Sequence, residues 1–227
     1  MSKNAEENED LIVDVQEVYS KSEEFIEKNK TVLISFVLGF IIVVGGFFGY
    51  KKLIIAPMEY EAQSDMFMAE KYFSQDSLQK AINGDGLNSG FIDIVDEYSG
   101  TKAANLAHYY LGICYRNTGD FEGAIDELNQ FSSDDVMIST VAIGAIGDSY
   151  MELGDANEAA SYYEKAVKNG GNKLTSPIYL FKAGMAYEET QDYTKAYDKY
   201  KAIKADYPDS REAQTIDKYI ARAEGLK

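Results

Sequence analysis

Three stretches of this sequence align with one another without a gap, and they constrain the fold more than any other feature. They run from Leu111 to Leu128, from Ile146 to Tyr163 and from Ala183 to Tyr200, and glycine, tyrosine, aspartate and alanine recur in the same four columns. The glycines are 35 and 37 residues apart. A period of this length is typical of arrays of helix pairs, in which each pair buries its apolar face only against its neighbours. The sequence therefore predicts an all-α solenoid of antiparallel helix pairs, a class that binds partners and rarely catalyses reactions.

The recurring columns also predict how each helix pair is built. A glycine on the first helix lets the second helix approach closely, and the tyrosine three residues later lies on the same face as a large packing group. The aspartate column is expected to begin the second helices. Gly119 and Gly154 precede two of these aspartates, at a position that ends a helix with positive φ. Gln191 holds this position in the third stretch, so we predict a more strained turn there.

The pattern resembles the tetratricopeptide repeat, whose motif runs W-x-x-L-G-x-x-Y, then A-x-x-x-F, then P. In that frame the repeats begin at Asn105, Thr140 and Pro177, and Pro208 falls at the position of the terminal proline. The chain departs from the motif at its tryptophan position, because it contains no tryptophan. The resemblance implies three regular repeats over residues 105–208, followed by a capping helix within residues 209–227.

A second feature lies near the start of the chain. Thr31 to Tyr50 is a run of 20 residues without a charge. As a helix it would be about 30 Å long, the thickness of the hydrocarbon core of a bilayer. Lys51 and Lys52 follow this run, where a cleaved signal peptide would have a small-residue cleavage site. We therefore expect a single, retained transmembrane helix over residues 31–50.

Small residues within this span are spaced for contact with another helix. Gly45 and Gly49 form a G-x-x-x-G pair, a spacing that permits close helix approach in lipid. Glycine is common in membrane helices in any case, so a specific helix partner and an ordinary membrane helix both remain open.

The lysines that flank the span bear on its orientation. Three lysines lie within the ten residues before it and two follow it directly, so the positive-inside rule slightly favours a cytoplasmic N-terminus. The repeats would then lie in the periplasm. That compartment is oxidising, but Cys114 is the only cysteine and has no partner in the chain. We expect it to be a small, buried apolar group.

Helical patterns also cover the segments around the span. Residues 1–30 form an acidic tail, in which Leu11 to Lys30 has apolar residues at helical spacing. This stretch is either an amphipathic helix with a protein partner or an outward continuation of the membrane helix. Residues 51–104 read as a helical stalk and a divergent first repeat, with helices over Glu59 to Phe73 and Phe91 to Tyr98. The terminal capping helix is expected over Ser210 to Gly225.

The glycine-rich stretch from Asn83 to Gly90 is expected to be a surface loop. It lacks the alternating acidic ligands of an EF-hand and the Gly-Lys-Ser/Thr ending of a phosphate-binding loop. A calcium-binding or phosphate-binding role is therefore not predicted for it.

The charge and the rare residues exclude several functions. A net charge of −16 argues against a nucleic-acid partner. His108 and Cys114 are six residues apart, about 240° around a helix, so they cannot form a local catalytic pair. His108 falls at a packing position of the repeat. We predict no catalytic residues, no metal, no cofactor and no small-molecule substrate.

The resemblance to tetratricopeptide repeats implies a binding groove. In that family the concave groove is lined by first-helix residues at repeat positions two, five, nine and twelve. The residues at these positions are Leu106, Tyr109, Ile113, Arg116, Val141, Gly144, Asp148, Met151, Ile178, Phe181, Met185 and Glu188. The candidate partner-binding residues among them are Tyr109, Ile113, Arg116, Asp148, Met151, Phe181, Met185 and Glu188.

Such a groove would be aromatic, apolar and methionine-bearing, with few charges. Because methionine adapts to varied apolar partners, an unfolded or extended protein segment fits it better than a charged C-terminal peptide. The alternative is that some of these residues pack between repeats.

The order of segments suggests a narrower resemblance. The motif F-x-E-x-N-K at Phe25, Glu27 and Asn29 precedes the single span, and helical repeats follow it. This organisation is similar to the YfgM-type family of ancillary SecYEG translocon subunits. It implies an inner-membrane protein whose periplasmic repeats contact the translocon and periplasmic chaperones. The alternative is a scaffold for another cell-envelope assembly complex, although such scaffolds usually carry a lipoprotein cysteine or a cleaved signal.

Overall fold

The computed structural model describes the backbone of residues 3–227 and the side chains of residues 21–227. Over the described backbone it consists of helices and their connections, without a strand. This confirms the predicted all-α class. The chain forms two compact units, Met1–Ala56 and Pro57–Lys227.

The first unit is a single long helix, α1, over Lys3–Tyr50, which is followed by a short π-helix over Lys51–Ile55. The α-helix ends at Tyr50, where the uncharged run also ends. Most of its described apolar side chains are exposed, as at Phe36, which is 75% exposed. The most apolar window of the helix has a mean hydropathy of 2.6, and none of it is buried. By length and composition, this helix can cross a membrane.

The apolar pattern predicted over residues 11–30 lies partly outside the side chains that the structure describes. Of its described members, Phe25 and Ile26 are exposed. The choice between an amphipathic helix with a partner and an extension of the membrane helix stays a prediction.

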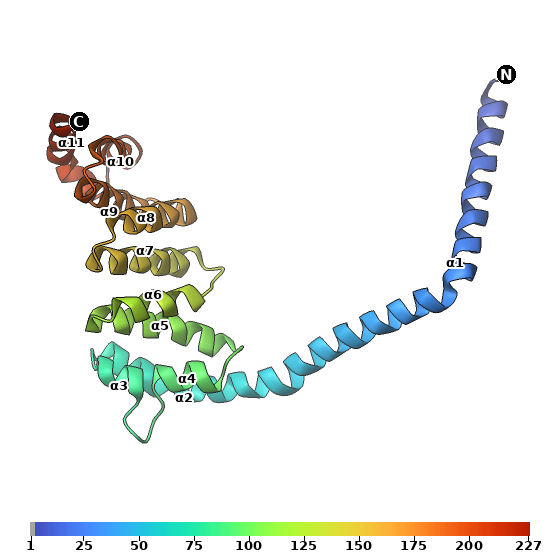
Figure 1. Cartoon of the computed structure of the whole chain (residues 1–227), viewed down its shortest axis with the longest axis horizontal. Coiled ribbons are helices and arrows are strands. Elements are labelled where there is room, and N and C mark those ends of the chain that lie inside the picture. Colours follow the sequence, from blue (N-terminus) through green and yellow to red (C-terminus); the bar gives the residue numbers. More distant parts are fainter. Residues whose placement is uncertain (1–2) are drawn as a thin grey trace. The chain divides into compact units, whose positions relative to one another are not determined.

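The second unit is a stack of helix layers (Figure 1). It begins with α2 over Ala56–Ser74, α3 over Leu78–Asn83 and α4 over Phe91–Glu97. Three regular pairs follow, α5 with α6 over Lys102–Thr118 and Phe121–Gln130, α7 with α8 over Val136–Glu152 and Ala156–Gly170, and α9 with α10 over Ser176–Glu189 and Tyr193–Asp206. The stack ends with a 3₁₀ turn over Glu212–Thr215 and α11 over Ile216–Leu226.

The glycine column closes each regular pair, as predicted. A Cβ atom built on Gly147 would lie 2.7 Å from the ring of Tyr163, and one built on Gly184 would lie 2.3 Å from the ring of Tyr200. Leu128 takes the same role in the first pair, against the first glycine of the column. In each case the partner lies sixteen residues after the glycine, on the second helix of the pair. The absence of a side chain therefore allows a large residue to pack directly against the first helix.

The turns within the pairs also follow the prediction. Each aspartate of the column caps its second helix, and Asp155, for example, accepts a hydrogen bond from the backbone N–H of Glu158 at 3.1 Å. The glycines before the first two caps have φ of 88° and 81°, whereas Gln191 has φ of 61°. A non-glycine residue in this left-handed region is strained by about 1–2 kcal/mol. The third turn is therefore the strained one.

The ends of the array depart in detail from the sequence pattern. The helix α3 was not predicted, because it is a single short turn next to the glycine-rich loop. Asp85 stabilises that loop, because it accepts hydrogen bonds from Leu87 N, Asn88 N and the hydroxyl of Tyr72. The capping helix begins at Ile216, later than the predicted Ser210. The predicted domain boundaries after residues 104 and 208 stay predictions.

Candidate binding groove

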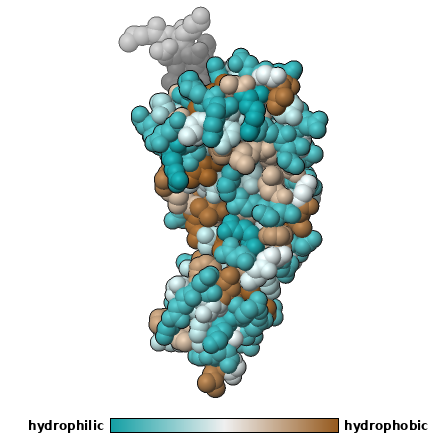
Figure 2. Space-filling model, turned by 90° about the vertical axis from the view of Figure 1, so that its left-hand side faces the viewer, coloured by the Kyte–Doolittle hydropathy of each residue, from teal (hydrophilic) through white to brown (hydrophobic). Residues whose placement is uncertain are grey.

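A groove crosses the first helices of the three regular pairs. It encloses about 880 Å³, within the range of protein ligand pockets. Its apolar wall comes from Phe121, Met151, Phe181 and Met185. Met185 is 45% exposed, so part of this wall is open to a partner. The face of the array shown in Figure 2 is mostly hydrophilic and carries several hydrophobic patches.

The rear of the apolar wall is fixed by aromatic packing. The ring of Phe181 meets Tyr219 of the capping helix edge to face, with 4.8 Å between centroids, and lies 5.9 Å from the ring of Tyr200. Tyr200 is the residue that packs against Gly184. Tyr200 therefore both closes the third helix pair and supports Phe181 of the groove.

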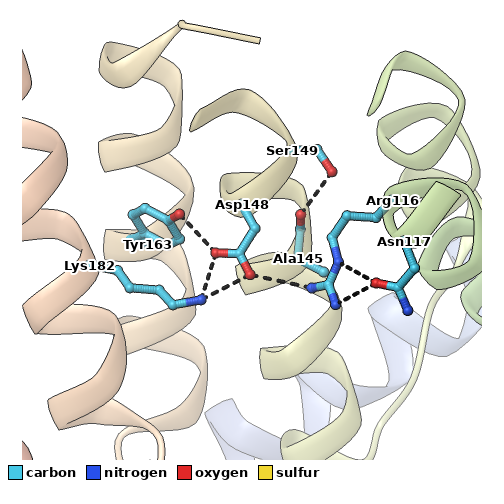
Figure 3. Close-up of polar contacts among 7 residues, drawn as sticks. All are labelled: Arg116, Asn117, Ala145, Asp148, Ser149, Tyr163 and Lys182. Carbon is cyan, nitrogen blue, oxygen red and sulfur yellow. Dashed lines mark hydrogen bonds and ion pairs between the residues drawn. The ribbon is translucent and has the colours of Figure 1, made fainter. Parts of the chain in front are cut away.

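A carboxylate lies at the polar centre of the groove (Figure 3). Asp148 on α7 accepts a hydrogen bond at Oδ1 from the hydroxyl of Tyr163, at 2.8 Å. Lys182 Nζ on α9 lies 2.6 Å from Oδ1 and 2.9 Å from Oδ2. Arg116 Nη1 on α5 lies 3.3 Å from Oδ2. The three charged residues come from three different repeats, so this cluster links the stacked pairs.

Burial affects the protonation of Tyr163. Burial raises the pKa of Tyr163, and the charge of Asp148 and its hydrogen bond raise it further. Tyr163 therefore stays protonated and keeps donating to the carboxylate. The ammonium of Lys182 also lies 5.7 Å from the ring centroid of Tyr163 and 5.8 Å from that of Tyr179, where both π faces can attract it.

The eight candidate residues from the sequence divide into two groups. The five that line the groove are Arg116, Asp148, Met151, Phe181 and Met185. The other three, Tyr109, Ile113 and Glu188, lie outside its lining.

These three residues make structural contacts instead. Ile113 is only 8% exposed and belongs to the core between the first two regular pairs. Tyr109 packs against the ring of Phe131, with 5.2 Å between centroids. Glu188 forms an ion pair with Arg222 of the capping helix. Position five of the second repeat is likewise structural, because a Cβ on Gly144 would meet the ring of Tyr179 at 2.1 Å.

The sequence pattern missed seven of the residues that line the groove, among them Glu152, Tyr163 and Lys182. Four charged residues line the groove, Arg116, Asp148, Glu152 and Lys182, where the sequence pattern predicted few charges. One signal was available for Lys182, because it lies four residues after Ile178 and thus on the same helix face. Tyr163 gave no such signal, since it lies on the second helix at the position that packs against the glycine column.

The single histidine and the single cysteine both contribute to packing between or within helices. His108 is not a plain core residue, because its Nδ1 lies 2.6 Å from Glu127 Oε2 and this contact links α5 to α6. Cys114 is buried as predicted, and burial raises the pKa of its thiol to about 12. Such a thiol is inert at neutral pH. Among the described residues, no group of His, Cys, Asp or Glu is arranged to hold a metal ion.

Comparison with known protein families agrees with this architecture. Two family models of the tetratricopeptide repeat match the chain, one at residues 106–134 and the other at residues 145–211. The chain contains tetratricopeptide repeats. Arrays of these repeats act generally as scaffolds for protein–protein interaction, which is the role expected of an extended concave surface.

Solved structures show the same fold. Two crystal structures of the nearly identical TPR-like repeats of a Podosopora anserina putative kinesin light chain are similar to this chain, and one of them carries a single substitution. Each match covers 73% of this chain and 86% of the other, with a TM-score of 0.53. The sequence identity is 17% for the substituted form and 16% for the other. At this identity the likeness concerns the fold alone. A search of curated proteins found no significant match.

Proposed function

We propose that this chain is a membrane-anchored tetratricopeptide module that binds extended protein segments in the groove of α5, α7 and α9. The observation that carries the proposal is the open apolar wall, in which Met151, Phe181 and Met185 are contributed by neighbouring repeats. An extended segment can lay alternate apolar side chains along such a wall, and flexible methionines adapt to different sequences.

The anchor in this proposal is α1. Its uncharged run has the length of a membrane span, and the lysines on its N-terminal side outnumber those directly after it. These features support a cytoplasmic N-terminus and a repeat domain on the periplasmic side of an inner membrane. The acidic surface, at a net charge of −16, disfavours adhesion of the repeats to anionic headgroups.

The role that we propose for the module is ancillary to protein secretion. The F-x-E-x-N-K motif before the span and the order of segments resemble YfgM-type translocon subunits. In that role the groove would receive emerging or unfolded chains beside the SecYEG translocon and periplasmic chaperones. The alternative is a scaffold for another cell-envelope assembly complex, for which the same groove would hold a fixed partner.

Site-specific photocrosslinking in membranes tests the binding surface. A photoreactive phenylalanine analogue at Phe181 or Met185 should capture protein partners, whereas the same analogue at Asp198, a position on α10 outside the groove lining, should not. Mass spectrometry then separates the two roles. Translocon subunits, chaperones or nascent envelope proteins support the first, and a single assembly factor supports the alternative. Equal capture from Asp198 would contradict a groove-specific site.

A cysteine-accessibility assay tests the topology. Lys227→Cys places a thiol at the C-terminal residue, and the unmodified chain is the control because Cys114 is buried. A membrane-impermeant maleimide applied from the periplasmic side should label the variant in cells with an intact inner membrane. Labelling only after lysis would place the repeats in the cytoplasm and contradict the proposed orientation.

A further inference from the structure

In the polar cluster around Asp148, hydrogen-bond donors remain unused, whereas the acceptor positions of Asp148 do not. A carboxylate offers about four acceptor positions. Asp148 already accepts from Tyr163 and Lys182 at Oδ1, and from Lys182 and Arg116 at Oδ2. Its acceptor positions are therefore filled from within the chain.

The two cations around Asp148 are less fully used. A guanidinium has five N–H donors and an ammonium has three. Arg116 makes one contact to Asp148 and two to Asn117, and all three are long, between 3.2 and 3.4 Å. Lys182 makes two hydrogen bonds, both to Asp148. The capacity that remains at the centre of the groove is thus for donating hydrogen bonds.

The charges of the groove favour the same kind of ligand. Arg116 and Lys182 carry two positive charges against the single carboxylate that they contact, and their side chains are 29% and 35% exposed. Glu152 also lines the groove, so its four charged residues have a net charge of zero. The whole chain, by contrast, has a net charge of −16. Beside Asp148, a ligand cation would meet two like charges and a carboxylate whose acceptor positions are filled, and Glu152 would be the one groove carboxylate left to attract it. A ligand carboxylate would meet available donors at a partly desolvated site, where charge-assisted hydrogen bonds are strong.

We infer that the groove selects extended segments in which an aspartate or glutamate lies between apolar residues, and that Asp148 acts as an internal competitor for Arg116 and Lys182. The inference rests on the proposed peptide-binding function and names the chemistry of its ligand. The partner's carboxylate would share or replace the contacts of Asp148, while its apolar neighbours cover Met151 and Met185. The competitor weakens the binding of every acidic segment and so keeps the exchange of segments fast.

Fluorescence anisotropy with three labelled peptides tests this inference. The peptides share one short, extended, apolar sequence and differ only in a central glutamate, glutamine or lysine. The protein is the full chain in nanodiscs of zwitterionic phosphatidylcholine, so that anionic lipid does not compete. The glutamate peptide should bind about 5- to 10-fold more tightly than the glutamine peptide, and the lysine peptide should bind most weakly.

Variants of the cluster decide whether the preference arises there. Asp148→Asn removes the competing charge but keeps an acceptor for Tyr163, and should strengthen binding of the glutamate peptide by about 3- to 10-fold. Arg116→Gln and Lys182→Gln should each reduce the preference for glutamate over glutamine. Lys204→Gln, which breaks an exposed ion pair with Asp217 outside the groove lining, is the matched control and should change neither affinity.

The outcomes separate this inference from the proposed function. If all three peptides bind equally, or if Asp148→Asn leaves the glutamate peptide no more tightly bound, the inference is overturned while groove binding stands. If none of the peptides binds, the proposed function fails and the inference fails with it. Thermal unfolding of each variant, followed by circular dichroism, identifies any variant that has lost its fold. Should Asp148→Asn unfold, the Arg116→Gln and Lys182→Gln results decide the question alone.

Discussion

Gly147 and Asp148 are neighbours on α7, yet they belong to faces with opposite requirements. Gly147 faces α8, where the ring of Tyr163 leaves no room for a Cβ. Asp148 faces the groove, where its carboxylate is 25% exposed and contacts two cations from other repeats. The first face specifies the fold and tolerates little change. The second face does not close the helix pair, and its partial exposure makes it accessible to a ligand.

The largest effect on the packing face is expected at alkaline pH. Burial, together with the nearby carboxylates of Asp148 and Glu164 respectively, raises the pKa values of Tyr179 and Tyr187 to about 12. Because an unfolded tyrosine has a pKa of about 10, the stabilisation is complete below pH 10 and is lost as the pH rises towards 12. Unfolding followed by circular dichroism should show the array losing stability across this window. Constant stability up to pH 12 would contradict the buried tyrosine packing.

A single added side chain on the packing face should have the next largest effect. Gly184→Val would drive a side chain into the ring of Tyr200, which is fully buried, and should destabilise the array by about 2–3 kcal/mol. Gly225→Ala is the matched control, since nothing lies within 4 Å of that position. Chemical denaturation of both variants measures the difference. Equal stability would mean that the glycine column does not close the pairs.

Removal of a cap should cost less than overpacking. Asp155→Ala removes the acceptor for the N–H of Glu158 and should destabilise the array by about 1 kcal/mol. Asp198→Ala, at a position inside α10 away from any helix cap, provides the comparison. A shift of the denaturation midpoint that is the same for both variants would argue against capping as the cause.

The strained turn should give the smallest change, with the opposite sign. Gln191→Gly relieves a positive φ of 61° and should stabilise the array by about 0.5–1 kcal/mol. The reverse change, Gly154→Gln, places a side chain at φ of 81° and should destabilise it by a similar amount. Thermal unfolding of this pair shows whether the two shifts are opposite.

The difference between the two faces also explains what could be predicted from the sequence. The helix pairs, the glycine column and the aspartate caps depend on contacts within one repeat, and the recurrence of each repeat made them visible. The membrane-length helix was predictable from one uncharged run. The start of the capping helix was not, because turn residues before Ile216 continue the helical pattern without forming an α-helix.

The groove was only half predictable for a related reason. The repeat positions that line the groove in the tetratricopeptide family led to Met151, Phe181 and Met185, which line the groove here. The same positions also led to Ile113, which is in the core. The cluster at Asp148 joins residues that are 32, 34 and 15 positions away in the sequence. These residues meet only when the repeats stack, and no pattern within a single repeat records which charges will face one another.

Binding of the glutamine peptide to a variant of the apolar wall tests the central claim most directly. Met151→Ala with Met185→Ala removes two groove side chains that lie outside the fully buried core. We predict that affinity for this uncharged, extended peptide falls by about tenfold or more. The double variant should keep its fold, because Met185 is exposed and Met151 is only partly buried against the core. Unchanged affinity in the folded double variant would contradict the claim that this groove is the binding site.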